Sequence, residues 1–344
     1  MEYRPLMTTL VGSLPKPSWL GKEAGTYSTF QDLGAALEEA QDDATIVAIR
    51  EQELTGLDIV SDGEQRREHY IRHVIRRFSG FDFDHLSEKQ TRGGRYTVQV
   101  PRITGPVART EPVLARDFAV LRKYATRAVK ITLPGPLTII DTSHDDFYGD
   151  KRALAFDLAA ALNAEARELA AAGCDLIQID EPTFNIYLDD VAAFGIEALD
   201  RVVAGVDAET AVHICYGYGA PTVLRWKRQN QDWGQYRQTL PWLATSQVDQ
   251  LALEFAAPNL DPAVLELTGE KRVAMGVVDV SVDTLDTPEM VADRLRRALE
   301  YISPDRLLAS TDCGLVPVER TRAYAKLRAL VEGTKLVRRE LGLE

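Results

Sequence analysis

Short apolar runs alternate along the chain with longer stretches in which apolar residues recur every three or four positions. Eight runs have the length and composition of buried strands, and they are 8–12, 58–62, 129–133, 175–180, 211–215, 251–254, 273–277 and 307–311. Four stretches have the period of helices, and they are 33–55, 151–172, 288–302 and 318–341. Because strands and helices alternate, we expect the strands to form a parallel sheet.

Eight strand–helix units in 344 residues suit an α/β protein with one (β/α)8 TIM barrel over residues 1–344. An open, doubly wound sheet is the alternative, because it has the same alternation of elements. Two helix boundaries carry clear signals. Gly173 follows the second helical stretch as a C-cap, and Thr287 precedes Pro288 at the start of the third.

Two segments interrupt the alternation. Residues 80–110 contain the alternating run 96–100, which predicts a β-hairpin insertion outside the barrel. Residues 216–248 form a long loop or helical insertion directly after the fifth strand and hold three of the four tryptophans. This insertion would either close over the site as a lid or pack its aromatic side chains on the barrel, and the sequence favours neither.

Composition and charge narrow the class of protein. The net charge of -12 argues against nucleic acid as a general partner. No run of 18 apolar residues predicts a membrane helix, and the first five residues lack the apolar core of a signal peptide. Three cysteines, an odd number, do not suggest a disulfide framework. We therefore expect a cytoplasmic protein with reduced thiols and no membrane partner.

Four residues of metal-binding type stand at the ends of predicted strands. His213 and Cys215 are two positions apart, so a strand places both side chains on one face. Glu254 ends the run 251–254, and Cys313 follows the run 307–311. Because α/β proteins build their sites at the carboxyl ends of strands, these residues predict a zinc site. Zinc in such a site lowers the pKa of an incoming thiol, which points to chemistry at sulfur.

The alternative for the cysteines is that they are small buried side chains with no ligand role. Cys174 fits that alternative, because it precedes its strand and so lies at the end opposite the site. Cys215 and Cys313 both fall at the site end, where a ligand role is favoured.

Carboxylates follow two further strands. Glu64 comes after the second strand, and Asp180 and Glu181 end the fourth. Glu64 and Asp180 would hold a substrate ammonium group through charge-assisted hydrogen bonds, whereas Glu181 is equally suited to capping a helix. After the first strand, Gly12 permits close approach of a ligand to the backbone, and Ser13 offers an amide and a hydroxyl to a carboxylate. A simple turn is the alternative for these two residues.

A basic run covers residues 66–77, with five arginines in twelve positions. Its apolar residues share one face, which predicts an amphipathic helix with a solvated basic face. Contact with an anionic cosubstrate or an acidic partner near Glu64 is the alternative. His69 and His73 are one helical turn apart, but no third ligand is near them, so a second metal site is not expected.

Together these motifs resemble the C-terminal catalytic barrel of the cobalamin-independent methionine synthase family. The matching segments occur in the family's order across essentially the whole chain, and they are 9–15, 62–64, 133–138, 178–182, 213–215 and 312–315. The resemblance implies that Zn2+ is bound by His213, Cys215, Glu254 and Cys313. It also implies that homocysteine is held by Val11, Ser13, Glu64 and Asp180.

The chain also departs from that family. Two-barrel members carry an N-terminal half that helps to bind folate, and 344 residues leave no room for it. Thr142 stands where the family has a tryptophan that stacks on the pterin, Ile186 where it has a folate-contacting glutamate, and Ser281 where it has a proton-donating histidine. The chain thus resembles the short, single-barrel core branch. Its expected methyl donor is not methyl-folate but methylcobalamin or a methylated corrinoid protein.

The expected activity is that of a methionine synthase, a zinc-dependent homocysteine S-methyltransferase. The nearest alternative is zinc-dependent alkyl transfer to coenzyme M, in which cations would bind a sulfonate. The two acids argue against it, and the arginines of 66–77 argue for it. A zinc hydrolase is a further alternative, although a thiolate-rich site does not favour metal-bound water. A structural zinc site in a binding module is the last alternative, because closed four-ligand sites are typical of structural zinc.

Overall fold

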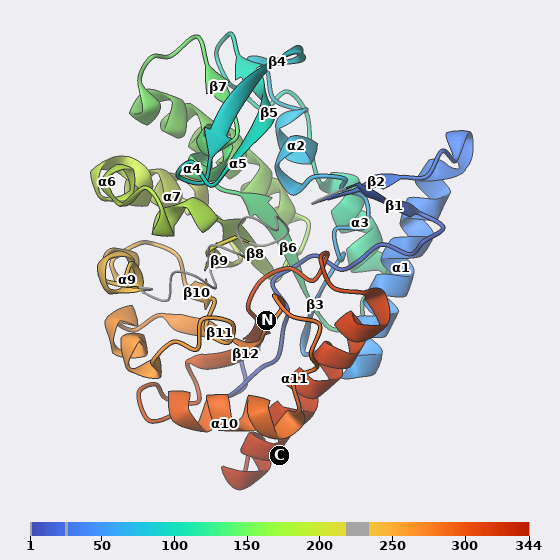
Figure 1. Cartoon of the computed structure of the whole chain (residues 1–344), viewed down its shortest axis with the longest axis vertical. Coiled ribbons are helices and arrows are strands. Elements are labelled where there is room, and N and C mark those ends of the chain that lie inside the picture. Colours follow the sequence, from blue (N-terminus) through green and yellow to red (C-terminus); the bar gives the residue numbers. More distant parts are fainter. Residues whose placement is uncertain (1, 25–26, 218–233, 344) are drawn as a thin grey trace.

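The structure is a computed structural model, and it describes residues 2–24, 27–217 and 234–343. Seven parallel strands form one curved sheet in the order β12-β11-β10-β9-β8-β6-β3 (Figure 1). They are β3 (Ile59–Ser61), β6 (Ala128–Pro134), β8 (Leu176–Asp180), β9 (Glu209–Ile214), β10 (Gln250–Leu253), β11 (Arg272–Val278) and β12 (Leu307–Thr311). The strands follow one another in sequence order with no reversal, which excludes the doubly wound alternative.

The segment at residues 7–9 joins the two edges of this sheet. The Ile59 amide donates to the Thr8 carbonyl at 3.1 Å, and the Ala309 amide donates to the Met7 carbonyl at 2.9 Å. The sheet therefore closes into the predicted barrel. The prediction of a regular strand at 8–12 is wrong, because the Val11 amide donates to the Thr311 side chain rather than to a strand backbone.

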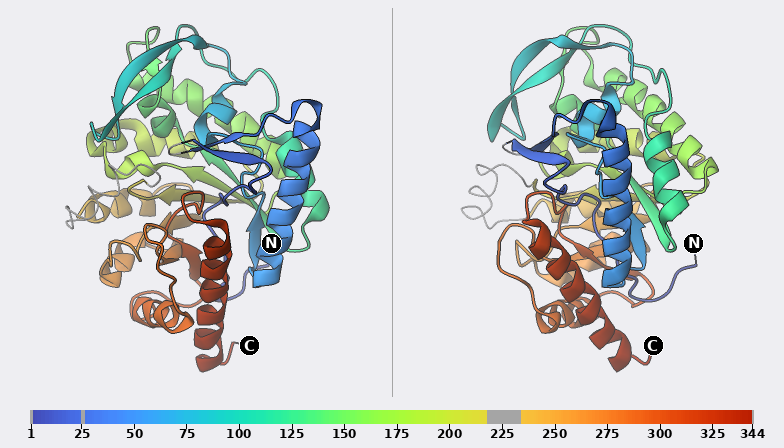
Figure 2. Two further views of the ribbon diagram at one scale, coloured as in Figure 1. Left: turned by 45° about the vertical axis from the view of Figure 1, so that its right-hand side comes forward. Right: turned by 90° about the vertical axis from the view of Figure 1, so that its right-hand side faces the viewer.

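Helices surround the sheet (Figures 1 and 2). Their bounds are α1 (Leu37–Thr55), α2 (Tyr70–Ile75), α3 (Ala115–Tyr124), α4 (Pro136–Asp141), α5 (Lys151–Ala171), α6 (Leu188–Asp190), α7 (Ile196–Val203), α9 (Tyr236–Ala244), α10 (Pro288–Ala298) and α11 (Arg320–Glu340). The two predicted boundaries are confirmed. Gly173 follows α5 with φ 92°, and the Thr287 hydroxyl accepts from the Met290 amide at the start of α10.

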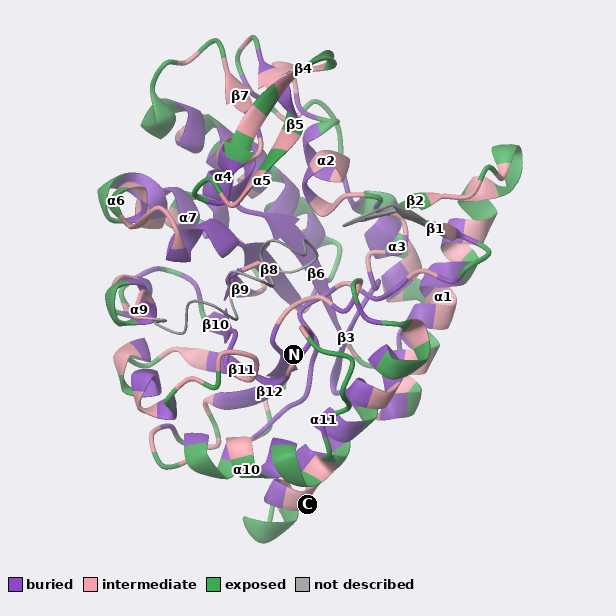
Figure 3. Cartoon of the chain, viewed as in Figure 1, coloured by how far each residue is buried: buried purple, intermediate pink, exposed green. Residues whose placement is uncertain are grey.

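The amino-terminal end of the barrel interior is filled by a layer of apolar side chains. One residue comes from each of six strands and one from the closing segment, and they are Met7, Ile59, Leu176, Ala211, Ala252, Ala274 and Leu308. The central strands are buried, and exposed residues gather on the outer helices (Figure 3). Because this end is packed, a site inside the barrel must lie at the carboxyl ends of the strands.

The predicted hairpin insertion is confirmed. β4 (Phe81–Thr91) pairs antiparallel with β5 (Tyr96–Ile103), and the short β7 (His144–Asp145) adds to β5. The turn of the hairpin lies against the carboxyl end of the barrel, where Arg92 pairs with Asp141 of α4 at 3.1 Å and the Gly93 amide donates to the Tyr187 hydroxyl at 3.0 Å (Figure 1). Two further antiparallel strands, β1 (Gly21–Ala24) and β2 (Tyr27–Phe30), lie early in the chain. Residues 218–233, about half of the insertion predicted at 216–248, lie outside the described residues, and the lid hypothesis falls on them.

The basic run at 66–77 agrees with its prediction in part, since it contains a helix with one buried apolar face, formed by Ile71, Val74 and Ile75, and Arg76 and Arg77 are exposed. Only Tyr70–Ile75 is helical, and Arg66 and Arg67 lie before the helix, where their side chains are buried in ion pairs with Asp42, Asp62 and Asp117. Arg76 and Arg77 contact the Phe83 ring and Glu111. The run is therefore a set of paired arginines, because acids and an aromatic ring of neighbouring segments reach each of these side chains.

In residues 2–24, 27–217 and 234–343, no helix has the length and apolar character needed to cross a membrane.

Candidate metal and substrate site

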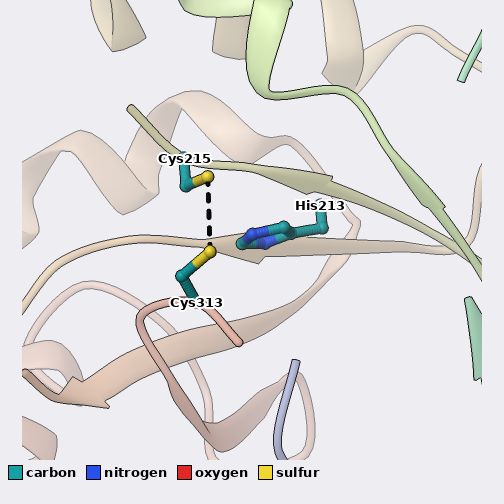
Figure 4. A group of neighbouring side chains, drawn as sticks. All are labelled: His213, Cys215 and Cys313. Carbon is teal, nitrogen blue, oxygen red and sulfur yellow. Dashed lines mark hydrogen bonds between the residues drawn. The ribbon is translucent and has the colours of Figure 1, made fainter. Parts of the chain in front are cut away.

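Two thiols and one imidazole converge at the carboxyl end of the barrel. His213 is on β9, Cys215 directly follows that strand, and Cys313 lies in the turn after β12. One ligand atom from each residue lies within 4.8 Å of the other two, and the two sulfur atoms are 3.6 Å apart (Figure 4). The i, i+2 spacing places His213 and Cys215 on one face, and the curvature of the sheet brings Cys313 to them.

The orientation of the His213 ring suits a metal ligand. Nδ1 lies 3.1 Å from the Ala252 carbonyl oxygen, which can only accept, so Nδ1 carries the proton and Nε2 the lone pair. Among the residues that the structure describes, Nε2 is buried without a hydrogen-bond partner. Histidine ligands of metals are commonly oriented by such a bond from the other nitrogen. The buried lone pair beside two thiols therefore fits a zinc ion.

Glu254, the fourth predicted ligand, lies close to this group but is not one of the three residues that share the 4.8 Å limit. It directly follows β10 and is fully buried, and its Oε2 accepts from the Tyr216 amide at 2.8 Å. Next to it, Asp312 accepts from three successive backbone amides at 255–257. Burial raises the pKa of Asp312 well above its usual range, and the negative charge of Glu254 adds to that effect.

The two acids predicted to hold an ammonium group lie on neighbouring parts of the barrel. Glu64 follows β3 with a positive φ of 54°, a conformation that is uncommon outside glycine, and its amide donates to Asp62 at 3.0 Å. Its Oε1 accepts from the Thr132 hydroxyl at 2.9 Å. Asp180 ends β8 and accepts from the Gln178 amide group at 2.8 Å. Burial raises the pKa of Asp180 to about 7, and the nearby Glu64 carboxylate acts in the same direction while His213 opposes it.

The turn at residues 11–13, which follows the closing segment, lies beside the two acids and beside the turn that carries Cys313. The Val11 carbonyl accepts from Gln178 at 3.0 Å, so Val11 and Asp180 share one donor residue. A Cβ atom on Gly12 would lie 3.0 Å from Glu64 Oε1, and one on Gly314 would lie 2.1 Å from Ser13 Oγ. Glycine is needed at both positions for this approach. Ser13 therefore packs against the turn that carries Cys313.

Known proteins identify the family to which the chain belongs. A family profile described as the catalytic domain of cobalamin-independent synthase matches residues 6–336, nearly the whole chain. The chain belongs to this family. Its similarity to curated relatives extends over nearly their full length as well. It is 32% identical to a protein named methionine synthase from Sulfurisphaera tokodaii, over 99% of this chain and 95% of that protein.

Further relatives agree. A methionine synthase from Saccharolobus solfataricus is 34% identical over 99% of this chain and 98% of its own length. Among solved structures, a B12-independent methionine synthase from Shewanella sp. W3-18-1, in complex with selenomethionine, superimposes with a TM-score of 0.94. That protein is 42% identical, and the match covers 98% of this chain and 99% of that one. This chain thus matches each of these relatives over nearly its full length.

Glu181, which the sequence left open between capping and function, caps a helix. Its carboxylate accepts from the Leu137 and Thr138 amides at the start of α4, and from the Thr138 and Thr183 hydroxyls. A Cβ atom on Gly135 would lie 2.2 Å from Glu181 Oε1, so the carboxylate reaches α4 only because Gly135 has no side chain. Burial raises the pKa of Glu181 to about 7. This arrangement explains Glu181 without a substrate.

Several buried polar residues near the acids were missed by the sequence analysis. Lys130 and Thr132 lie inside an otherwise apolar strand, Gln178 lies two positions before Asp180, and Arg67 is part of the basic run. All four are at most 2% exposed. A lysine within an apolar strand was a usable signal, because a charge is buried only where partners receive it.

Proposed function

We propose that the protein is a zinc-dependent methyltransferase that makes methionine from homocysteine. The observation that carries this proposal is the convergence of Cys215, Cys313 and the buried lone pair of His213. Thiolate and imidazole ligands are the set that zinc prefers, and they occur here in a family whose curated members are named methionine synthases. Selenomethionine, bound in the 42% identical relative, is the selenium analogue of the proposed product.

His213, Cys215 and Cys313 would hold the zinc ion, with Glu254 as a fourth ligand that gives way to the substrate. To serve in this way, the Glu254 carboxylate would turn from the Tyr216 amide that it now accepts from at 2.8 Å. When bound, zinc would lower the pKa of the homocysteine thiol, so that the sulfur is a thiolate at neutral pH.

Glu64 and Asp180 would bind the amino group of homocysteine, and Ser13 with the backbone at Val11 would bind its carboxylate. An ammonium group placed beside Asp180 favours the ionised carboxylate, which offsets the burial that raises the pKa of this acid. Held at both ends, the substrate has its sulfur fixed for attack on a methyl carbon. A bond forms from sulfur to carbon as the bond from carbon to the donor breaks, and positioning lowers the barrier to this step.

The methyl donor is proposed to be something other than methyl-folate. Ile186 and Thr142 lie where a carboxylate and a stacking ring would recognise a pterin. The hairpin turn packs against Ile186, since a Cβ atom on Gly93 would lie 3.1 Å from the Ile186 side chain. Lys89 of the same hairpin donates to the Ile140 and Ser143 carbonyls, which lie on either side of Thr142 in the sequence. Without a carboxylate and an aromatic ring at these two positions, a donor such as methylcobalamin or a methylated corrinoid protein is favoured over a pterin.

The ion pairs of Arg66, Arg67 and Arg77 do not favour coenzyme M. The sequence feature for that alternative was the basic run at 66–77, which would bind a sulfonate. Arg66 and Arg67 are engaged by buried acids, and Arg77 by Glu111 at 2.6 Å. A sulfonate would have to displace the buried pairs of Arg66 and Arg67, at a cost of several kcal/mol for each buried charge left without its partner, whereas the exposed pair of Arg77 with Glu111 opposes it little.

The test is to incubate the zinc-loaded protein with homocysteine and, in parallel, methyl-folate or methylcobalamin, and to measure methionine. Methionine from methylcobalamin alone is the expected result. Methionine from methyl-folate would refute the donor proposal and leave the substrate proposal intact. If neither donor reacts and homocysteine does not bind the zinc-loaded protein in a calorimetric titration, the substrate proposal is wrong.

A further inference from the structure

We infer that β6 carries two positioning residues, Lys130 and Thr132, each of which fixes one of the proposed ammonium-binding acids through a hydrogen-bonded chain. β6 lies between β3 and β8, the two strands that Glu64 follows and Asp180 ends. Lys130 and Thr132 are two positions apart, so their side chains point to the same face. In the register of the sheet, Thr132 is the direct partner of Gln178.

The first chain runs from Lys130 to Asp180. Lys130 Nζ donates to Gln178 Oε1 at 3.1 Å and also to the Leu10 carbonyl. With its oxygen held in this way, the Gln178 side chain turns its amide nitrogen to Asp180 Oδ1 at 2.8 Å and to the Val11 carbonyl at 3.0 Å. Lys130 thus determines which end of the Gln178 amide faces the acid.

The second chain runs from Arg67 to Glu64. Arg67 Nη1 donates to the Thr132 hydroxyl at 2.9 Å and to the Thr132 carbonyl at 2.9 Å. Because the hydroxyl oxygen receives this donor, its own proton points to Glu64 Oε1, 2.9 Å away. The Arg67 charge is matched elsewhere, by Asp62 at 3.3 Å and by Asp117 at 3.8 Å.

Both chains place a neutral side chain between the acid and a buried basic group. Gln178 and Thr132 orient the carboxylates without neutralising them, whereas a direct ion pair would compete with an incoming ammonium group. The arrangement therefore keeps both carboxyl groups oriented and out of direct ion pairs with Lys130 and Arg67, so that the amino group of the substrate can pair with them. This inference rests on the proposed function, because it assumes that Glu64 and Asp180 bind an ammonium group.

The readout is selectivity for that amino group. L-Homocysteine and 4-mercaptobutanoate have the same thiol and carboxylate, and only the first has an amine. Their dissociation constants for the zinc-loaded protein are measured by calorimetric titration, with a phosphine in place of a thiol reductant. In Thr132→Val and Lys130→Met the ratio of the two constants should fall by about tenfold or more, as expected for one weakened charge-assisted hydrogen bond. Affinity for 4-mercaptobutanoate should stay unchanged.

Matched variants separate positioning from general damage. Thr132→Ser keeps the hydroxyl and should keep the selectivity. Thr334→Val removes a buried threonine of α11 that donates to the Leu330 carbonyl, and Lys326→Met removes a buried lysine of α11 that donates to two backbone carbonyls and pairs with Asp286 at 3.1 Å. Both should leave the ratio as in the unaltered protein. If Lys130→Met does not fold, Gln178→Met interrupts the same chain at its next member.

The outcomes distinguish this inference from the proposed function. An unaltered protein that prefers homocysteine, with variants that lose that preference, supports both. Variants that keep the preference, or that weaken both ligands equally, overturn the inference and leave the proposed function standing. An unaltered protein without any preference for homocysteine refutes the proposed amino-group contact and the inference with it.

Discussion

The Asp312 carboxylate lies directly over Gly276 of β11. This strand lies between β12, which Asp312 follows, and β10, which Glu254 follows. Asp312 follows β12, and the amides that it binds, at residues 255–257, follow β10. To reach them it crosses β11, where a Cβ atom on Gly276 would lie only 2.1 Å from Asp312 Oδ1. The absence of a side chain at one strand position thus allows the turn with Cys313 and the loop after Glu254 to be joined.

Replacing Gly276 with alanine should disturb this connection. The added methyl group would displace Asp312, leave buried amides without their acceptor and shift Cys313, the next residue. We expect a loss of about 1–3 kcal/mol in the free energy of unfolding, as for other overpacked sites, together with weaker zinc binding. Urea unfolding and metal analysis after dialysis measure the two effects. Normal stability with full zinc content would contradict the role given to Gly276.

Zinc binding should depend on Cys313 and not on Cys174. Cys313→Ser replaces a soft thiolate with a hydroxyl, so bound zinc and methionine formation should be lost together. Cys174→Ser is the matched control, because Cys174 lies before the start of β8, at the end of the barrel opposite the site. Burial raises the pKa of its thiol to about 12, and its sulfur donates to the Leu176 carbonyl. The measurement is the zinc content of the two purified variants, which should be lost in Cys313→Ser and kept in Cys174→Ser. Zinc retained by Cys313→Ser would remove this residue from the site.

Glu181 should matter for stability rather than for the substrate. Glu181→Gln puts an amide group against donors at the start of α4, and we expect the free energy of unfolding to fall by about 1–3 kcal/mol. Zinc content and homocysteine affinity should persist in the folded variant. The control is Glu319→Gln, at an exposed cap of α11 that accepts from the Thr321 and Arg322 amides, where the loss should be smaller. Loss of homocysteine binding in a stable Glu181→Gln protein would indicate a substrate role instead.

The sequence predicted seven strands of the sheet correctly because each is an apolar run flanked by helical patterns. It failed at 8–12, where the residues that close the barrel leave regular pairing to bond with the Thr311 side chain. Residues of metal-binding type were recognisable because strand ends in a parallel barrel converge. The hydrogen-bonded chain from Arg67 through Thr132 to Glu64 was not recognisable from the sequence. Thr132 is 65 residues from Arg67 and 68 residues from Glu64, and only the packing of β6 beside β3 brings them together.

The structure also explains why the acidic partners of Arg66 and Arg67 were not predicted. Charge patterning along a sequence shows where arginines lie but not which acids face them. Asp117, the acid that engages Arg66, lies 51 residues further along the chain on α3, and Asp42 lies on α1. A cluster of like charges in one segment was therefore neutralised by segments whose position depends on the fold.

Lys130 predicts a specific dependence of stability on pH. Burial lowers the pKa of Lys130 to about 7, against the opposite influence of Asp180 and Glu64. In the unfolded chain a lysine titrates near about 10.4. Between these values the unfolded state holds a proton that the folded state has released, so the free energy of unfolding rises with pH. The penalty of burying this group is complete below pH 7 and disappears as the pH approaches 10.

Lys130→Met removes the titration of this lysine, and the variant has all other titratable groups in common with the unaltered protein. The stability of the unaltered protein minus that of Lys130→Met should therefore increase from pH 7 to pH 9, with a slope of up to about 1.4 kcal/mol per pH unit. Urea unfolding of both zinc-loaded proteins at the two pH values measures it, since titrations that the proteins share cancel in the difference. A difference that stays constant would mean that folded Lys130 keeps its proton throughout. The buried base at the start of the chain to Asp180 would then be a permanent cation.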